Sequence, residues 1–205
     1  MAKESILTRL SLTECQLTDL VDDNPSLRGI LLGYTAEWKL REYLSDLKEI
    51  EYLGKDDDHD RKSKGDLRVR YNGHEFRIES KSLQTNSIKK NLDGTHVGKV
   101  QCDASDRRNI RLPDGSTVNT TLLQYGEFDV LASNLFAFEN KWAFTFSLNR
   151  DLPHTTYAKY TESQQKYLIA SLVTVTMPPV SPFTSDLVSL LDMLVNERES
   201  SSQRR

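Results

Sequence analysis

Asp66, Glu79 and Lys81 offer two carboxylates and an ammonium group at a spacing that a β-hairpin would bring together. Asn72-Gly73, which lies between them, is a strong hairpin signal because both turn positions require positive φ. Strands paired about this turn place Asp66 opposite Glu79, with Lys81 two residues further along the same face. Like charges directly opposite each other repel. Two converging carboxylates suit Mg²⁺, which takes oxygen ligands and is usually held by one or two carboxylates together with phosphate.

The register that this turn predicts gives the hairpin one apolar face and one charged face. A charged face is compatible with a metal site and equally with simple solvation, so the spacing alone leaves both interpretations open. The predicted pairs are Leu67 with Ile78 and Val69 with Phe76 on the apolar face, and Arg70 with Glu75 and Arg68 with Arg77 on the charged face.

A helix is predicted over residues 26–48, and Glu37 falls on its apolar stripe. A carboxylate on a core-facing stripe is costly unless it is paired, hydrogen-bonded or bound to a metal ion. At the edge of the stripe, Glu37 would instead reach water. Periodicity allows both positions.

Other helices are predicted near both ends of the chain, and apolar strands in its middle. Asn24-Pro25-Ser26 breaks the first helical region, in which Thr13 is a candidate start of a second segment. Thr161 and Gln164 resemble a capping box that opens a later helix. Near-continuous apolar runs suit a central sheet that is covered on both faces. The expected elements are helices over 3–23, 161–170 and 185–197, and strands over 49–53, 127–138, 142–148 and 172–176.

The charges of the chain are unevenly distributed although its net charge is only −3 over 205 residues. Residues 42–60 are mainly acidic, whereas residues 61–90 are rich in lysine and arginine and contain Asp66, Glu75 and Glu79 as their acidic residues. A basic block around a carboxylate pair would suit a phosphodiester substrate, because phosphate contacts supply most of the non-specific affinity for nucleic acids. An ordinary solvated surface is the alternative.

The segment from Ser82 to Val100 is polar and rich in turns, so we expect its order to depend on substrate. Amide side chains are suited to contacts with base edges, and lysine and arginine are suited to phosphate contacts. Two adjacent arginines at 107 and 108 could clamp phosphate or form a surface ion network. The candidate DNA-binding residues are Lys62, Lys64, Gln84, Asn86, Lys89, Lys90, Gln101, Arg107 and Arg108.

Composition excludes several other classes of protein. Cys15 and Cys102 are far apart and, with four scattered histidines, show no zinc-ligand spacing and no disulfide framework. No apolar run approaches the roughly 20 residues that span a bilayer, and the N-terminus lacks the basic-then-apolar pattern of a signal peptide. A hydrophobic content of 37% and a charged content of 28% are typical of a globular protein. We therefore expect a cytoplasmic location.

The order of these features resembles the core of the PD-(D/E)XK nuclease superfamily. The family's aspartate is matched by Asp66, with Gly65 where proline is common, and its acidic-x-lysine motif by Glu79-Ser80-Lys81. The helix carboxylate found in many members is matched by Glu37 in Gly33-Tyr34-Thr35-Ala36-Glu37. The resemblance covers about residues 28–150. Neighbouring patterns such as Lys-Gly-Asp, Glu-Ser-Lys-Ser-Leu-Gln and Gly-Glu-Phe-Asp-Val-Leu-Ala are most similar to type II restriction endonucleases.

The resemblance implies an α/β fold, with a mixed central β-sheet flanked by helices in a restriction-endonuclease-like core. It implies one nuclease domain over residues 1–205, with a core at about 28–150 and the segments 3–23 and 161–199 as additions. Asp66 and Glu79 would bind Mg²⁺, helped by the Ser80 carbonyl and by Glu37 if a second ion is present. Lys81 would position or deprotonate the attacking water and stabilise the developing charge.

The expected activity is therefore site-specific, magnesium-dependent hydrolysis of double-stranded DNA in a restriction (anti-phage) system. Reading a palindrome on both strands would favour a homodimer with two-fold symmetry. Two alternatives remain open. The chain could be a repair or recombination nuclease that recognises DNA structure, or a nucleic-acid-binding module in which the carboxylates only stabilise the hairpin.

Overall fold

The structure is a computed structural model that describes residues 4–55 and 65–203. Its main element is a mixed five-stranded sheet with the order β1-β2-β3-β8-β9, in which β3 and β8 are parallel and the other neighbours antiparallel. This confirms the expected α/β architecture with a mixed central sheet. The strands are β1 (Ile50–Lys55), β2 (Leu67–Tyr71), β3 (His74–Ser82), β8 (Val130–Asn134) and β9 (Phe144–Leu148).

The chain divides into two compact units, residues Met1–Thr35 and Ala36–Arg205. In the first unit, the helical region expected over residues 3–23 consists of two helices, α1 (Ile6–Leu10) and α2 (Glu14–Asp22). Thr13 starts the second with a complete capping box, as its position suggested. Neither helix has a buried residue. A third helix, α3 (Pro25–Asp46), begins in this unit and ends in the next.

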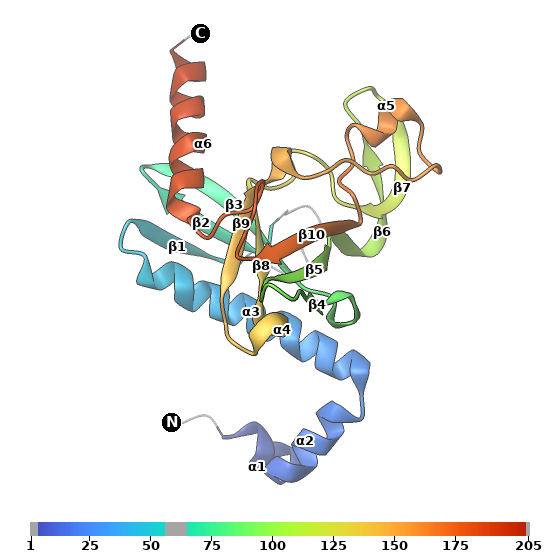
Figure 1. Ribbon diagram of the computed structural model, residues 1–205. Coiled ribbons are helices and arrows are strands. Elements are labelled where there is room, and N and C mark those ends of the chain that lie inside the picture. The colour runs from blue at the N-terminus through green and yellow to red at the C-terminus, as the bar shows by residue number, and fades with distance from the viewer. Residues whose placement is uncertain (1–3, 56–64, 204–205) are drawn as a thin grey trace. The chain divides into compact units, whose positions relative to one another are not determined.

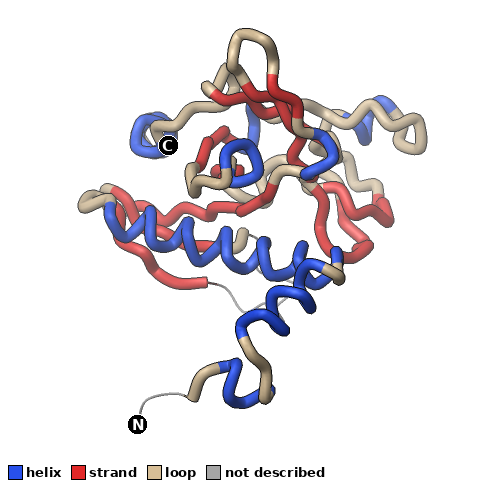
Figure 2. Tube along the Cα trace, turned by 60° about the horizontal axis from the view of Figure 1, so that its bottom comes forward, coloured by secondary structure: helices blue, strands red, loops and turns tan. Residues whose placement is uncertain are grey.

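One face of the central sheet is covered by helices. Leu40 and Leu44 of α3 and Leu187 and Leu191 of α6 (Leu187–Ser202) belong to one hydrophobic cluster, which also contains Phe76 and other inward residues of the sheet (Figure 1). Figure 2 shows α3 running alongside the strands. The two helices bury the apolar face that the hairpin register predicts, because side chains of a strand alternate between its two faces.

The other face of the sheet is covered by a second, smaller sheet. That sheet has the order β10-β5-β4, and its strands are β10 (Leu172–Met177), β5 (His96–Gln101) and β4 (Lys89–Lys90). Leu131 of β8 packs with Val100, Val173 and Val175 in a second hydrophobic cluster. Every residue of β8 and β9 is buried. This confirms the prediction, drawn from their apolar sequences, of strands covered on both faces.

A two-stranded ribbon, β6 (Asp103–Arg111) and β7 (Thr117–Leu122), was not predicted. Its turn contains Pro113-Asp114-Gly115, residue types that favour turns, and the apolar residues Ile110 and Val118 on the two sides of the turn pair in the ribbon. The ribbon packs against the segment that contains α5 (Glu162–Gln165), through a cluster that includes Tyr160 and Leu168 (Figure 1).

Other boundaries also differ from the predictions. The helix expected to run from Thr161 to about residue 170 ends at Gln165, because the chain then forms bridges from Leu168 and Ile169 to other segments. The apolar run 127–138 is divided between β8 and the short helix α4 (Phe136–Glu139). The remaining elements are two 3-10 turns, η1 (Thr85–Ser87) and η2 (Asn149–Asp151). In the described part of the chain, no helix is long and apolar enough to cross a membrane.

Candidate active site

The β2–β3 hairpin has the register that its turn predicted. Asn72 and Gly73 have φ of 47° and 78°, and the strands pair Leu67 with Ile78 and Arg68 with Arg77. Asp66 directly precedes β2, and its backbone N–H donates to the Ile78 carbonyl at 2.9 Å. Its carboxylate Oδ2 accepts the Ser80 N–H at 2.7 Å. Asp66 is therefore anchored to β3 from both its backbone and its side chain.

Gly65 makes the close approach of this segment to β3 feasible. Its φ is +93°, and a Cβ built on it would lie 3.0 Å from the Cβ of Arg77. Proline, which the resembled family commonly has at this position, fixes φ near −65°. The departure from the family pattern thus has a local cause: this backbone conformation suits glycine and excludes proline.

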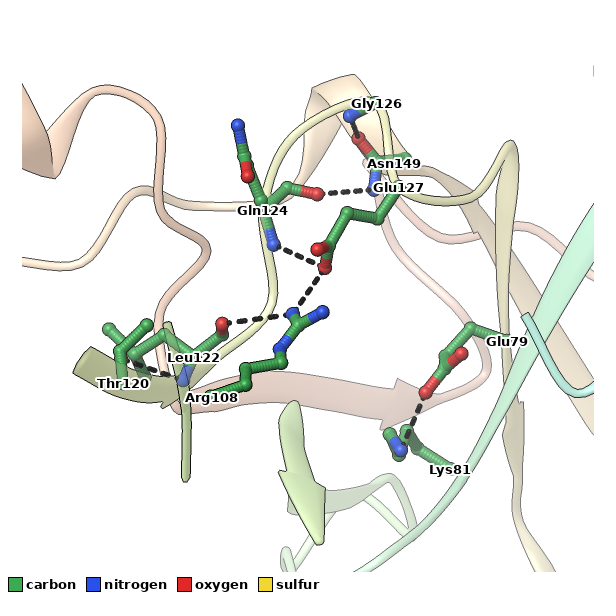
Figure 3. Close-up of polar contacts among 9 residues, drawn as sticks. All are labelled: Glu79, Lys81, Arg108, Thr120, Leu122, Gln124, Gly126, Glu127 and Asn149. Carbon is green, nitrogen blue, oxygen red and sulfur yellow. Dashed lines mark hydrogen bonds and ion pairs between the residues drawn. The ribbon is translucent and has the colours of Figure 1, made fainter. Parts of the chain in front are cut away.

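Glu79 and Lys81 project from β3 on the face opposite Phe76 and Ile78, and they form an ion pair. Lys81 Nζ lies 2.7 Å from Glu79 Oε1, and the two side chains are only 20% and 11% exposed (Figure 3). β8 pairs with this end of β3 in parallel, with Lys81 beside Ser133. The fully covered neighbouring strand explains why two charged side chains of a central strand are this poorly solvated.

The surroundings of Asp66 alter its acidity. Burial and the nearby charge of Glu79 raise the pKa of Asp66 from 3.8 to about 7, against smaller lowering effects of Lys81 and the Ser80 N–H. The charge of Glu37 makes a smaller contribution to the same rise in the pKa of Asp66. Asp66 and Glu79 therefore repel each other in a poorly solvated place, as their opposition in the sequence-derived register indicated.

Burial alone would lower the pKa of Lys81, but the charges of Glu79 and Asp66 outweigh it and raise the pKa above its usual value. Lys81 is thus a charged ammonium group at neutral pH. In this state it has no lone pair with which to accept a proton, but it can stabilise negative charge.

Glu37 of α3 lies near these groups, since its charge contributes to the raised pKa of Asp66. It is next to Ala36, which is buried, and its side chain is 21% exposed. Lys55 of β1 donates to its Oε2 at 2.6 Å. The position at the edge of the buried stripe and the pairing with Lys55 explain how a carboxylate is tolerated here.

Cys102, which follows β5, is a neighbour of the site that the sequence did not reveal. It is fully buried, and burial raises the pKa of its thiol to about 12, with Lys81 opposing and Glu79 and Asp103 adding to the rise. Its thiol therefore stays neutral beside the ion pair. A single cysteine without a partner gives no spacing signal, so only the tertiary structure could identify it.

The DNA-binding candidates fall into three groups in the structure. Gln84 and Gln101 are hydrogen-bonded at 2.9 Å, and Gln101 in turn donates to Asp103 at 3.0 Å. Arg108 is largely buried and donates to Glu127 at 2.5 Å and to the Leu122 carbonyl at 3.3 Å (Figure 3). Its guanidinium thus already has a carboxylate partner. Exposed positions are held by Asn86, Lys89, Lys90 and Arg107, and Lys62 and Lys64 lie outside the described residues.

The donor set of the site fits a hard divalent cation. Within residues 4–55 and 65–203, no group of three or more His, Cys, Asp or Glu side chains is arranged to hold a metal ion. Asp66 and Glu79 provide two carboxylates, and Asp66 is bound by the Ser80 N–H through one oxygen, Oδ2. A divalent cation would relieve the repulsion that raises the pKa of Asp66. Two carboxylates with a backbone carbonyl match Mg²⁺, which keeps several waters or substrate oxygens in its shell.

Neither a protein-family model nor a curated protein sequence matches the chain. A solved structure that does match is that of a bacterial homing endonuclease, I-Ssp6803I, with 16% sequence identity and a TM-score of 0.38. The match covers 67% of this chain and 86% of the homing endonuclease chain. At this TM-score the likeness does not establish a common fold.

Proposed function

We propose that this protein is a magnesium-dependent endonuclease that hydrolyses phosphodiester bonds of double-stranded DNA. The observation that carries the proposal is the pair of mutually repelling carboxylates, Asp66 and Glu79, with Lys81 in contact with one of them. Such a group destabilises the folded protein unless a bound cation or substrate compensates for it. A structural ion pair would need one carboxylate beside Lys81, not two.

Asp66, Glu79 and the carbonyl of Ser80 are the groups that would hold Mg²⁺ in this mechanism. Bound there, the ion would supply positive charge to the scissile phosphate and make the attacking water more acidic. Asp66 must be ionised to act as a ligand, and its pKa of about 7 makes this change of state accessible near neutral pH. Glu37, now paired with Lys55, is the candidate further ligand if two ions bind.

Lys81 contributes a fixed positive charge beside the scissile phosphate. Of its two candidate roles, its raised pKa favours stabilisation of the charge that develops on phosphorus over removal of a proton from water. Its ion pair with Glu79 also orients the ammonium group toward the carboxylates.

The narrower proposal is a type II enzyme of a restriction system that acts as a homodimer. Apolar side chains on the helices of Met1–Thr35 support a partner chain, since Ile6, Leu10, Ile30 and Leu31 are each about half exposed. Sedimentation equilibrium should then give twice the chain mass of 23.5 kDa. A monomer at micromolar concentration would contradict this part of the proposal.

The first prediction concerns Lys81. Lys81→Ala should lower the cleavage rate by at least about 100-fold, because one stabilising charge contributes a few kcal/mol to the transition state. Binding to the same duplex should change little. Both are measured on long duplex DNAs with Mg²⁺ or with EDTA, and Lys99→Ala, which removes an exposed lysine of β5, is the matched control.

Discrete, metal-dependent fragments from the wild-type protein support a restriction enzyme. A smear or nicking supports a nuclease that recognises DNA structure instead. DNA that stays intact with Mg²⁺ contradicts the nuclease proposal, and undiminished cleavage by Lys81→Ala removes Lys81 from the mechanism.

A further inference from the structure

A groove with a volume of about 360 Å³ lies between the hairpin and residues 126–129, and both charged and apolar residues of the hairpin line it. β2 and β3 form one of its walls, residues 126–129 form the other, and Arg198 of α6 closes one side. Three arginines, Arg68, Arg77 and Arg198, line it together with Glu75, Glu127 and Asp129. The lining has as many arginines as carboxylates, so its formal charge does not favour an anion over a cation. Which ion the groove favours therefore depends on which of these charged groups already have a partner.

Each carboxylate of the groove already binds an arginine. Glu75 accepts from Arg70 at 3.0 Å and Glu127 from Arg108 at 2.5 Å. Asp129 accepts from Arg198 at 2.6 Å through one oxygen and from the Arg77 backbone N–H at 2.8 Å through the other. The negative charges that line the groove are therefore neutralised locally.

Arg77 is the exception among these groups. Its side chain is exposed, and the residues that the structure describes include no hydrogen-bond or ion-pair partner for its guanidinium. Arg68 lies directly opposite it on β2. Like charges in this position repel. The groove thus has an excess of positive charge at Arg77, in a place where hairpin stability alone would favour a neutral or acidic residue.

The wall that faces Arg77 is held in place by hydrogen bonds. The Arg108–Glu127 pair is joined by the Gln124 N–H, which donates to Glu127 at 2.9 Å, and Gly126 N–H donates to Asn149 at 2.8 Å. Figure 3 shows this network together with Glu79 and Lys81. An anion could therefore enter a preformed groove.

Arg77 is the residue of the groove that lies next to the candidate active site along β3. Arg77 and Glu79 point to the same face of β3 with Ile78 between them, which places them roughly 7 Å apart along the strand. Gly65, the residue before Asp66, runs so close to Arg77 that a Cβ built on it would lie 3.0 Å from the Cβ of Arg77. A polyanion bound at Asp66 and Glu79 is therefore within reach of Arg77.

We propose that this groove binds a phosphodiester group of the substrate DNA strand next to the scissile one, with Arg77 as its principal ligand. This assignment rests on the proposed nuclease function. It adds to that proposal the path that the DNA strand takes across the hairpin. Arginine suits this contact because its planar group can bind two phosphate oxygens at once. Arg77 is thus a substrate-positioning residue.

The test is the salt dependence of duplex DNA binding by the full chain, measured with EDTA so that cleavage does not occur. Each phosphate contact contributes about 0.9 to the slope of log K against log salt concentration. Arg77→Gln should reduce the slope by about this amount, and Arg77→Lys should restore it. Lys141→Gln removes the same charge from the surface after α4, outside the groove, and should leave the slope unchanged.

Thermal unfolding separates this role from a structural one. Arg77→Gln should not lower the Tm, because the exposed Arg77 guanidinium has no partner among the described residues that the substitution would remove. The groove assignment would be overturned if Arg77→Gln had the same slope as the wild type, or if Lys141→Gln reduced the slope equally. The nuclease proposal would not be affected by either result, because the Lys81 variant tests it separately. If the wild-type protein binds no duplex DNA, both proposals fail.

Discussion

At the scale of single residues, Asp66 shows how the fold changes an ordinary carboxyl group. Its sequence neighbours are a glycine and a leucine, and nothing local perturbs it. Burial and the charge of Glu79, which is distant in sequence, raise its pKa to about 7. The folded protein therefore holds a proton on Asp66 that the unfolded chain releases near pH 3.8. Between these pH values the folded state binds more protons, so stability falls as the pH rises.

The difference between the pKa of Asp66 in the folded protein and in the unfolded chain predicts the effect of Asp66→Asn on stability. At pH 8 in EDTA, the variant should be more stable than the wild type by up to about 4 kcal/mol, because the amide removes a buried charge and can still accept the Ser80 N–H. The gain should disappear towards pH 4. Urea unfolding at several pH values measures it, and cleavage should be lost at every pH.

Asp93→Asn is a suitable control, because hydrogen bonds from Thr95 lower the pKa of Asp93 and reverse the sign of the effect. That variant should not be stabilised at pH 8. A free energy of unfolding for Asp66→Asn that equals the wild-type value at pH 8 would contradict the raised pKa of Asp66.

At the scale of elements, the hairpin and the segment before it decide the geometry of the site. The turn at Asn72-Gly73 sets the register, but the position of Asp66 also depends on the backbone of Gly65, which has φ of +93° and leaves no room for a Cβ beside Arg77. A side chain at this position would be strained and would also push against β3. The site therefore depends on the absence of a Cβ just outside the strand.

Gly65→Ala should consequently destabilise the protein by about 1–3 kcal/mol, the usual range for a residue held in an unfavourable backbone conformation. It should also slow cleavage, because Asp66 would move away from the Ser80 N–H. Urea unfolding and cleavage assays measure the two effects. Gly94→Ala is the matched control: it has a φ of +86° with no atom near its Cβ, in a turn away from the site. Equal loss of cleavage in both variants would contradict a local role for Gly65.

At the scale of the whole molecule, residues beyond 150 complete the core around the sheet. Leu187 and Leu191 of α6 pack with Phe76 and Phe146, and β10 contributes Val173 and Val175 to the cluster on the other face. The division of the chain into a core at 28–150 and later additions stays a prediction. The packing indicates that α6 and β10 stabilise the sheet whose strand β3 carries Glu79 and Lys81.

Leu191→Ala tests this contribution. Leu191 is fully buried, so the substitution should lower the free energy of unfolding by about 2–5 kcal/mol through the lost contacts and the resulting cavity. Met193 lies on the same helix and is 47% exposed, and Met193→Ala should have a much smaller effect. Denaturant unfolding of the two variants measures the difference. Similar losses would show that α6 does not pack in the core as described.

The sequence by itself determined the local features of this protein. The Asn72-Gly73 turn and the alternation of apolar residues specified the hairpin register, because strand side chains have a period of two. They also indicated that Asp66, Glu79 and Lys81 meet at one end of the hairpin. The apolar runs of β8 and β9 indicated strands covered on both faces.

The other features of the site were decided by the tertiary structure alone, because these features depend on contacts between residues that are distant in the chain. These include the second sheet that covers the site, the neutral Cys102 beside Lys81, and the ion pair between Arg108 and Glu127. Whether a charge is solvated, paired or left without a partner follows from burial, which spacing along the chain does not give. The raised pKa of Asp66 and the exposed Arg77 guanidinium are both consequences of this kind.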